Sequence, residues 1–253
     1  MYPIIISAFV FICVIAGALC GGAIRKRLPE HHLDGDAKDV IKLATGLIAT
    51  LSALVLGLLV ATAKTSFDNK IGQVRLIAAD MILLDNLLAQ YGPETAPARK
   101  LVRANIGLMV DQIWRENKPE AEHSPRFEIT RQAEEFLQAL YGLAPKNELQ
   151  VTLKGRIVQA ASDLANVRLA LFVQSGETIQ TPFQIILTLW LTMIFASFAL
   201  LTRPNSLVGT VLLFCAVSVA AAVFLIFDLD QPFSGILRIP DAPLRGVLPP
   251  LDS

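Results

Sequence analysis

Four long runs of apolar residues divide the chain, and none of them contains Asp, Glu, Lys, Arg or His. They cover residues 4–24, 43–63, 183–201 and 207–227, and each is 19–21 residues long. A helix rises about 1.5 Å per residue, so each run can cross the roughly 30 Å hydrocarbon core of a bilayer. Charged residues or prolines border the runs. The pattern therefore predicts four transmembrane helices.

The segment between the second and third runs, 64–182, is the only long polar part of the chain. Its apolar residues recur at steps of three and four, which is typical of amphipathic helices. This spacing predicts that the second transmembrane helix continues to about residue 91. It also predicts helices over about 96–116, 126–143 and 147–174. Because no stretch alternates apolar and polar residues long enough for a sheet, these helices are expected to form a bundle.

The predicted fold is an all-α integral membrane protein with a water-soluble helical bundle inserted between transmembrane helices two and three. Residues 1–63 would hold the first transmembrane pair and its short charged loop, 64–182 the bundle, and 183–227 the second pair. The tail, 228–253, contains five prolines and many apolar residues. Proline interrupts helices, so the tail is not expected to form a long one. It is expected to pack on the membrane surface or on the bundle.

Composition narrows the possible classes of protein. Hydrophobic residues make up 53% of the 253 residues, charged residues make up 17%, and the net charge is zero. Such a chain is too apolar to be disordered and has no charge excess that would attract nucleic acid. The chain has three cysteines, Cys13, Cys20 and Cys215, and all lie in the apolar runs. They are expected to be buried thiols that pack as small apolar groups.

Basic residues near the apolar runs predict the orientation in the membrane. The N-terminus lacks the basic residues of a signal peptide, so the first run is expected to stay as an anchor. Lysine and arginine favour the cytoplasmic side of short loops. Six basic residues lie in loops 25–42 and 202–206: Arg25, Lys26, Arg27, Lys38, Lys42 and Arg203. We therefore expect a multi-pass protein of the cell (inner) membrane whose 64–182 segment and tail lie on the extracytoplasmic side.

Four sequence segments resemble a known family. They are GLIATLSALVLGLLVATAKTSFD (46–68), YGPE (91–94), FASF (195–198) and LDQPFSG (229–235). Together they resemble a bacterial family of uncharacterised membrane proteins that is labelled bestrophin-like, and the resemblance covers about residues 5–250. The label implies an anion channel. Bestrophins place the domain between helices two and three in the cytosol, whereas the charge bias here places it outside.

The chain carries no recognisable catalytic or cofactor-binding motif. Phosphate-binding glycine loops of the GxxxxGK[ST] and GxGxxG kinds are absent, as are HExxH, CxxC and GxSxG. We therefore expect no enzyme activity, no cofactor and no metal ion. One loop does combine imidazole and carboxylate groups, at His31, His32, Asp34, Asp36 and Asp39. These groups could bind a divalent ion, but their spacing fits no known metal-binding loop, and a solvated linker is the favoured interpretation.

The apolar runs also bear on transport. Proton-coupled transporters usually carry ionisable residues at membrane depth, so the absence of these residues argues against ion-coupled transport. A channel stays possible, because an apolar constriction can gate by dewetting. Gln184, Thr188 and Thr192 recur every four residues on the third run. They could wet one face of the helix, but hydrogen bonding between helices is the favoured interpretation.

Two groups of residues are candidates for function. Small residues recur every four positions on the second run, at Thr45, Ala49, Ala53, Gly57 and Ala61. Small side chains let helices approach closely, so this stripe predicts a packing face, within one subunit or between subunits. Three carboxylates, Asp68, Asp228 and Asp230, follow the second and fourth runs. They are expected at one membrane level, as a salt-bridged joint or as a vestibule that attracts cations.

Two functions from different classes fit these features. The first is an envelope protein that senses or scaffolds an unknown partner through its bundle. The alternative is an oligomeric, bestrophin-like channel for small ions. Both hypotheses place the chain in a lipid bilayer, as a homo-oligomer, without nucleic acid. A ring of subunits around a continuous axial path would favour the channel.

Overall fold

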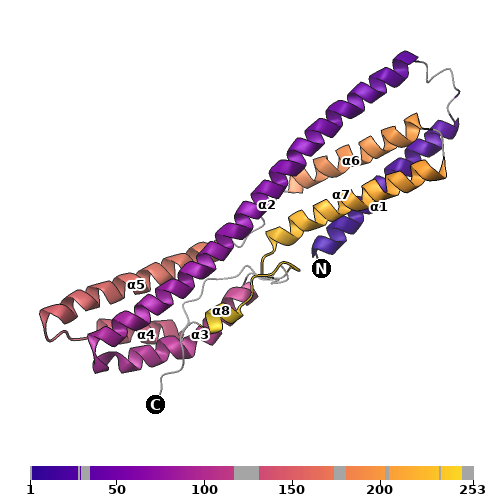
Figure 1. Ribbon diagram of the computed structural model, residues 1–253. Coiled ribbons are helices and arrows are strands. Elements are labelled where there is room, and N and C mark those ends of the chain that lie inside the picture. Colours follow the sequence, from indigo (N-terminus) through magenta and orange to yellow (C-terminus); the bar gives the residue numbers. More distant parts are fainter. Residues whose placement is uncertain are drawn as a thin grey trace. The chain divides into compact units, whose positions relative to one another are not determined.

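The computed structural model describes residues 2–27, 29, 35–116, 131–173, 181–202, 205–233 and 235–246. Its regular elements are helices, with no strand in these ranges, which confirms the all-α prediction (Figure 1). They are α1 (Tyr2–Arg27), α2 (Gly35–Tyr91), the 3-10 helix η2 (Pro93–Thr95), α3 (Ala96–Glu116), α4 (Arg131–Tyr141), α5 (Glu148–Val173), α6 (Thr181–Leu201), α7 (Ser206–Asp230) and α8 (Ala242–Arg245).

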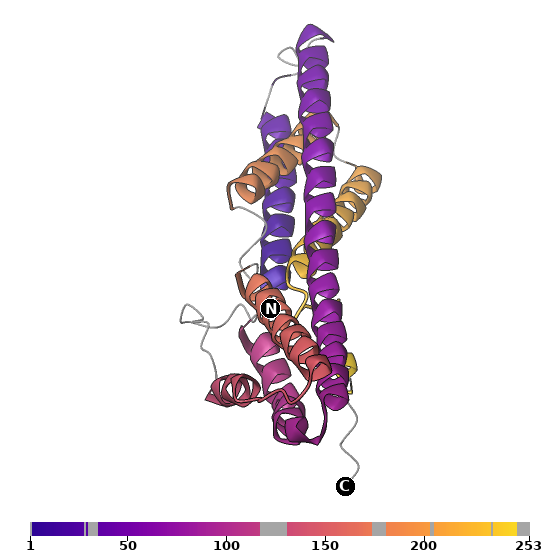
Figure 2. The ribbon, with the colours of Figure 1, turned by 90° about the vertical axis from the view of Figure 1, so that its left-hand side faces the viewer.

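Four of these helices are long and apolar enough to cross a membrane: α1, α2, α6 and α7. This confirms the four predicted spans. Helix α2 continues without a break for 57 residues, as the sequence predicts (Figure 2). Helices α3 and α5 begin and end within one residue of their predicted bounds. The start of the remaining predicted helix, 126–130, lies outside the described residues, and α4 is described from Arg131.

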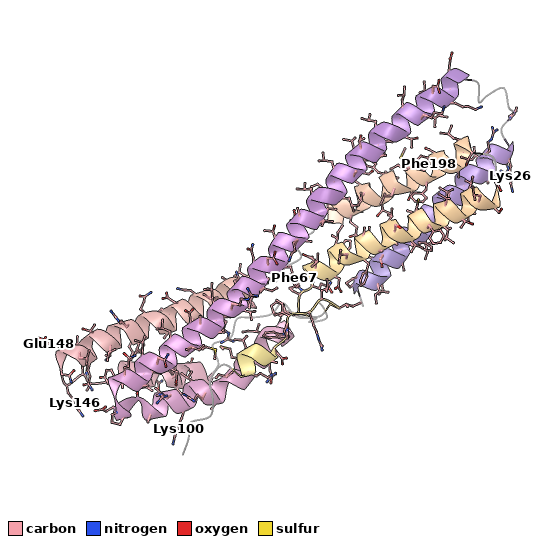
Figure 3. All side chains as sticks on the ribbon, in the orientation of Figure 1. Lys26, Phe67, Lys100, Lys146, Glu148 and Phe198 are labelled. Atoms are coloured by element: carbon pink, nitrogen blue, oxygen red, sulfur yellow. The ribbon has the colours of Figure 1, made fainter. Side chains whose placement is uncertain are left out.

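The chain divides into two compact units. The first, called here the membrane unit, contains Met1–Phe67 and Glu177–Asp230. The second, the bundle unit, contains Asp68–Gly176 and Gln231–Ser253. Phe67, labelled on α2 in Figure 3, is thus the last residue of the first segment of the membrane unit.

In the membrane unit, α1 contacts both α6 and α7. The core between these helices is apolar and includes the buried side chains of Val10, Val14 and Leu187. Gly21 lies so close to α6 that a methyl group in its place would overlap the carbonyl oxygen of Ala196. A methyl group at Gly17 would lie 2.7 Å from the carbonyl oxygen of Thr192. The absence of side chains at these two glycines is therefore what lets α1 and α6 touch backbone to backbone.

In the bundle unit, buried residues of α2 to α5 form a second apolar core. Its fully enclosed members include Leu84, Leu88, Leu140 and Ile157. Amphipathic helices are stable in water when their apolar faces cover one another in this way. The core explains why apolar residues recur at steps of three and four along 64–182.

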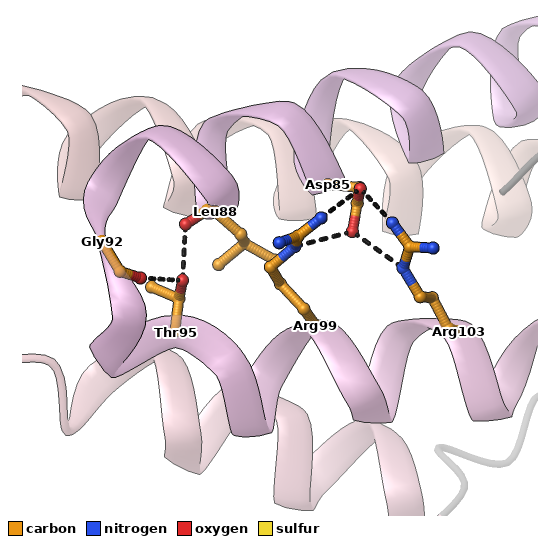
Figure 4. A network of polar contacts seen from close by, with 6 residues as sticks. All are labelled: Asp85, Leu88, Gly92, Thr95, Arg99 and Arg103. Atoms are coloured by element: carbon orange, nitrogen blue, oxygen red, sulfur yellow. Dashed lines mark hydrogen bonds and ion pairs between the residues drawn. The ribbon is translucent and has the colours of Figure 1, made fainter. Parts of the chain in front are cut away.

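The turn from α2 to α3 is built by the YGPE segment. Gly92 has φ of 133°, a conformation that a residue with a side chain rarely adopts, and this ends α2. Thr95 follows and donates its hydroxyl to the carbonyl oxygens of both Leu88 and Gly92 (Figure 4). The Tyr91 carbonyl oxygen accepts a hydrogen bond from Gln150 Nε2 at 3.0 Å, which ties the turn to α5. The YGPE segment therefore has a structural role at this end of the bundle.

The proline-rich tail packs against α3, and its described part contains only the four-residue helix α8. Trp114 Nε1 donates a hydrogen bond to the Ile239 carbonyl oxygen at 3.1 Å. The Trp114 ring also meets Phe233 edge to face, with centroids 5.2 Å apart. Arg245 of α8 pairs with Asp111 of α3. Of the two expected locations, packing on the bundle is thus confirmed for the base of the tail.

Candidate functional site

The membrane-spanning part of α2 presents one face to its own unit. Thr45, Ala49, Ser52, Leu56, Leu59 and Ala63 are buried or half-buried and recur at alternating steps of four and three; Ile48, Val55 and Val60 beside them are half-buried as well. Such spacing, about 3.5 residues per turn, keeps one side of a helix against its partners. The inward face of α2 is therefore a heptad seam of mixed size rather than a stripe of small residues.

The predicted small-residue stripe coincides with this inward face only at its N-terminal end and turns away from it toward the C-terminal end of the helix. Thr45 is buried and Ala49 is half-buried, but Ala53, Gly57 and Ala61 are exposed. A step of four residues turns about 40° past a full turn, so five such positions drift around about 160° of the helix. No atom of the chain lies within 4 Å of a methyl group placed on Gly57. The packing of the three exposed positions against another subunit stays a prediction.

A close helix contact through glycine does occur in the membrane unit, but on another helix. The sequence GALCG, residues 17–21, is a GxxxG motif, and Gly17 and Gly21 both contact α6. This motif favours close helix approach in membranes. Sequence reasoning missed it, although the four-residue spacing of the two glycines was a usable signal.

Two exposed faces of α2 lie side by side, on the part of the helix surface that does not pack against its own unit. One is the leucine face: Leu43, Leu47, Leu54 and Leu58, which are 61–76% exposed. The other, called here the small face, contains Gly46, Thr50, Ala53 and Gly57, all of them exposed. Only 11% of the α2 span is buried within the chain, against 22–28% for the other three spans. Helix α2 is thus the span that its own chain covers least.

The part of α2 in the bundle unit exposes leucines of its own. Leu76, Ala79 and Leu83 share one side of the helix at steps of three and four, and Leu76 and Leu83 are about half exposed. Lipid can cover exposed leucines within a membrane, but water cannot do so favourably. These leucines are therefore apolar surface of the bundle unit that this chain leaves uncovered.

The three predicted carboxylates lie at the ends of two membrane-spanning segments. Asp228 and Asp230 both lie at the C-terminal end of α7; Asp228 is 2% exposed and Asp230 is half-buried. Asp68 is exposed and is the first residue of the bundle unit. Each of the three takes part in a polar or electrostatic interaction. A cluster of all three stays a prediction.

The threonines of α6 do not bond across helices as the sequence analysis favoured. Thr188 Oγ1 donates to the Gln184 carbonyl oxygen and Thr192 Oγ1 to the Thr188 carbonyl oxygen, both at 2.8 Å. Both hydroxyl groups are therefore satisfied within α6. Gln184 and Thr188 do border a small pocket of the membrane unit, whose other walls are apolar and come from α1, α2, α6 and α7.

A charged site that sequence reasoning missed joins α2 to α3. The Asp85 carboxylate is 4% exposed and lies between two guanidinium groups (Figure 4). Arg99 donates through Nε and Nη2 at 3.1 and 3.0 Å, and Arg103 through the same atoms at 3.2 and 2.6 Å. Burial would raise the pKa of Asp85, but the hydrogen bonds from both arginines outweigh burial and lower it. The site pins two helices together, and the usable signal was an acidic residue on an apolar face.

The described residues offer no site for a metal ion, since they contain no group of three or more potential ligands. Of the candidate loop, His31, His32 and Asp34 lie outside the described residues, and Asp39 pairs with Lys42 at 3.1 Å. The expectation of buried thiols is wrong for Cys20 and Cys215. Both are exposed on the membrane unit, and Cys13 is half-buried.

Comparison with known proteins agrees with this helical architecture. The sequence profile described as the Bestrophin-like domain matches residues 12–244. Two crystal structures of a bacterial bestrophin homologue from Klebsiella pneumoniae, each with a single substitution to threonine, are similar to this chain, with TM-scores of 0.63 and 0.62. Their sequence identity is 15% and 14%, and each alignment covers 94% of this chain and 95% of the other. No curated protein matches the chain.

Proposed function

The chain belongs to the bestrophin-like family, and from this premise we propose that it is an oligomeric channel for small ions whose path follows α2. The similarity in fold extends over nearly the whole of both chains. This supports the second of the two hypotheses raised by the sequence better than the first. A sensor or scaffold that binds an envelope partner remains an expectation that no described feature tests.

An ion path is not expected inside a single chain. The core of the membrane unit consists of apolar side chains such as Val10, Val14 and Leu187. Transfer of an ion into such a core is prohibitively unfavourable without polar groups to replace its water. A path therefore needs several copies of the chain around an axis, which agrees with the homo-oligomer expected from the sequence.

The observation that carries the proposal is the exposure of α2. Its leucine face and small face leave it the least covered of the four spans. In a ring of copies, the small face would let the neighbouring subunit approach closely. The adjacent leucine face would then border the axis. Leucines around a narrow axis form an apolar constriction of the kind that gates by dewetting.

Flux through proteoliposomes tests the channel. Purified protein should release K⁺ or Cl⁻ down a gradient, and protein-free vesicles should not. Leu54→Thr should raise the flux several-fold because it wets the proposed constriction. The matched control is Leu213→Thr, the same change at an exposed leucine of α7, which should leave flux unchanged. Folded, inserted protein without any flux would remove the channel proposal, and equal effects of both changes would remove α2 from the path.

The acidic C-terminal end of α7 would affect ion selectivity if it lies on the ion path. Asp228 and Asp230 place two carboxylates at the end of a membrane-spanning helix. If they form a vestibule, Asp230→Asn should lower K⁺ flux relative to Cl⁻ flux and leave the melting temperature unchanged. If they form a joint, the same change should lower the melting temperature instead. A variant that behaves like the parent in both assays would exclude both roles.

The orientation belongs to the same proposal. Arg25, Lys26 and Arg27 form the last turn of α1, so a basic cluster immediately follows the first span. The positive-inside rule then places this end of α1 in the cytoplasm and the 64–182 segment on the extracytoplasmic side of the cell (inner) membrane.

A further inference from the structure

The tail folds into a closed loop directly after the last membrane-spanning helix. Helix α7 ends at Asp230, and the Gly235 amide donates to the Gln231 carbonyl oxygen at 2.9 Å. The Ile239 amide then returns to the Pro232 carbonyl oxygen at 2.7 Å. These two bonds tie the ends of the loop together, so Gly235–Arg238 form its tip.

The base of this loop is held by the bundle unit. Phe233 and Ile239 are 5% and 7% exposed. Trp114 fixes both of them, since its ring meets Phe233 and its Nε1 bonds to the Ile239 carbonyl oxygen. A loop that is closed by backbone hydrogen bonds and anchored by a buried aromatic residue has little freedom to bury its own tip.

The tip presents apolar side chains outward beside a cation. Ile236 is 74% exposed and Leu237 is 46% exposed, and Arg238, next in the chain, is exposed as well. A single exposed apolar residue needs no explanation in a water-soluble protein. Two adjacent ones followed by arginine are the composition of a segment that inserts at a membrane surface. In a segment of this kind, the apolar side chains enter the acyl boundary and the guanidinium group reaches the lipid phosphates.

The chain itself places a bilayer within reach. Ile236 is six residues beyond Asp230, the end of a span, and six residues extend at most about 20 Å. The closed loop shortens this distance. We propose that the tip Gly235–Arg238 inserts into the headgroup region of the bilayer, with Ile236 and Leu237 among the upper acyl carbons and Arg238 at the phosphates. This surface is distinct from the ion path and does not depend on the channel proposal.

Spin-label accessibility tests the insertion. The probe is a nitroxide on Ile236→Cys, in a full-length chain whose three native cysteines are replaced by serine. This protein is reconstituted into vesicles of phosphatidylethanolamine and phosphatidylglycerol. Lys100→Cys on α3 is the water-exposed control, and Phe214→Cys on α7 is the control for the acyl chains. Leu237→Cys repeats the measurement at the neighbouring position.

The expected result is an accessibility to oxygen several-fold higher than that of the Lys100→Cys label, with a matching loss of accessibility to a water-soluble nickel complex. Replacing phosphatidylglycerol by phosphatidylcholine should move the label to a shallower depth in the bilayer. In the Arg238→Gln variant, the label should lie at the same depth in both lipid mixtures. Accessibility equal to that of the Lys100→Cys label would overturn the proposal. A label that is immobile, shielded from both reagents and dipole-coupled to a second label would overturn it too, because another copy would then cover the tip.

Discussion

At the scale of single residues, Asp85 is the clearest test of what holds the bundle unit together. Its removal would leave two partly buried guanidinium groups without this carboxylate. Breaking a buried ion pair costs about 3–5 kcal/mol. We expect Asp85→Ala to lower the free energy of unfolding by this amount in denaturant titrations. Glu94→Gln, which removes an exposed pair with Lys146, should have far less effect; equal losses would contradict the account.

Because the pKa of Asp85 is lowered, the contribution of its ion pairs to the free energy of unfolding depends on pH. A carboxyl group with a depressed pKa in the folded state stabilises the fold at every pH above its unfolded value, which is about 3.9. The contribution disappears as the pH falls through the folded pKa, below that value. The stability difference between the parent and Asp85→Ala should therefore be full at neutral pH and shrink below about pH 4.

Asp80 is expected to behave in the opposite way. Burial, and then repulsion from Asp163, raise the pKa of Asp80. The folded state therefore binds this proton more tightly than the unfolded state, so this contribution is full below the unfolded pKa and is lost as the pH rises through the higher folded pKa. We expect Asp80→Asn to raise the melting temperature at neutral pH and to have no such benefit near pH 3. A lower melting temperature at neutral pH would show that the Asp80 carboxylate is stabilising.

Single residues were also where the sequence was least informative. The position of Asp85 on an apolar face was a local signal, but its partners Arg99 and Arg103 come beside it only through α3. That contact depends on the turn at Gly92 and on the helix pairing, neither of which appears in the local pattern.

At the scale of helices, Gly21 is expected to control the contact between α1 and α6. A methyl group at Gly21 overlaps the backbone of Ala196, and overpacking of this kind costs about 1–3 kcal/mol. Gly21→Ala should therefore lower the melting temperature of the detergent-solubilised protein. Gly22→Ala is the matched control, because nothing lies within 4 Å of a methyl group there. Identical melting of the two variants would show that α1 and α6 pack differently.

Gly57 is expected to act on assembly instead. A methyl group at Gly57 meets no atom of its own chain, so Gly57→Leu should leave the fold of one subunit intact. In the proposed ring it would separate α2 from the neighbouring subunit. Light scattering in detergent should show a smaller complex for Gly57→Leu, whereas Leu58→Ala should assemble like the parent. An unchanged mass for Gly57→Leu would mean that this face meets only lipid.

The helices themselves were largely predictable. Apolar spacing and the Gly92-Pro93 breaker gave α3 its bounds and ended α2 at Tyr91, because these signals are local in the chain. The partners of each helix face were not predictable in the same way. The stripe from Thr45 to Ala61 reads as one face at a step of four, yet a helix of 3.6 residues per turn rotates most of it away from its own unit.

At the scale of the whole molecule, the proposed orientation in the membrane rests on charge alone. In a cysteine-free background, a cysteine placed within residues 117–125 should react with an impermeant thiol reagent on intact spheroplasts. A cysteine at Asp36, at the start of α2, is the control and should react only after lysis. The reversed pattern would place the bundle in the cytosol, as in bestrophins, and would show that the basic residues do not determine the orientation here.

The central claim is that several copies of the chain surround an axis bordered by α2. Electron cryomicroscopy of the protein in lipid nanodiscs measures this most directly. The account predicts a symmetric ring in which the leucine face of α2, including Leu54 and Leu58, borders a continuous axial path. A monomer or dimer with solid packing, or a ring with α2 turned toward lipid, would contradict it.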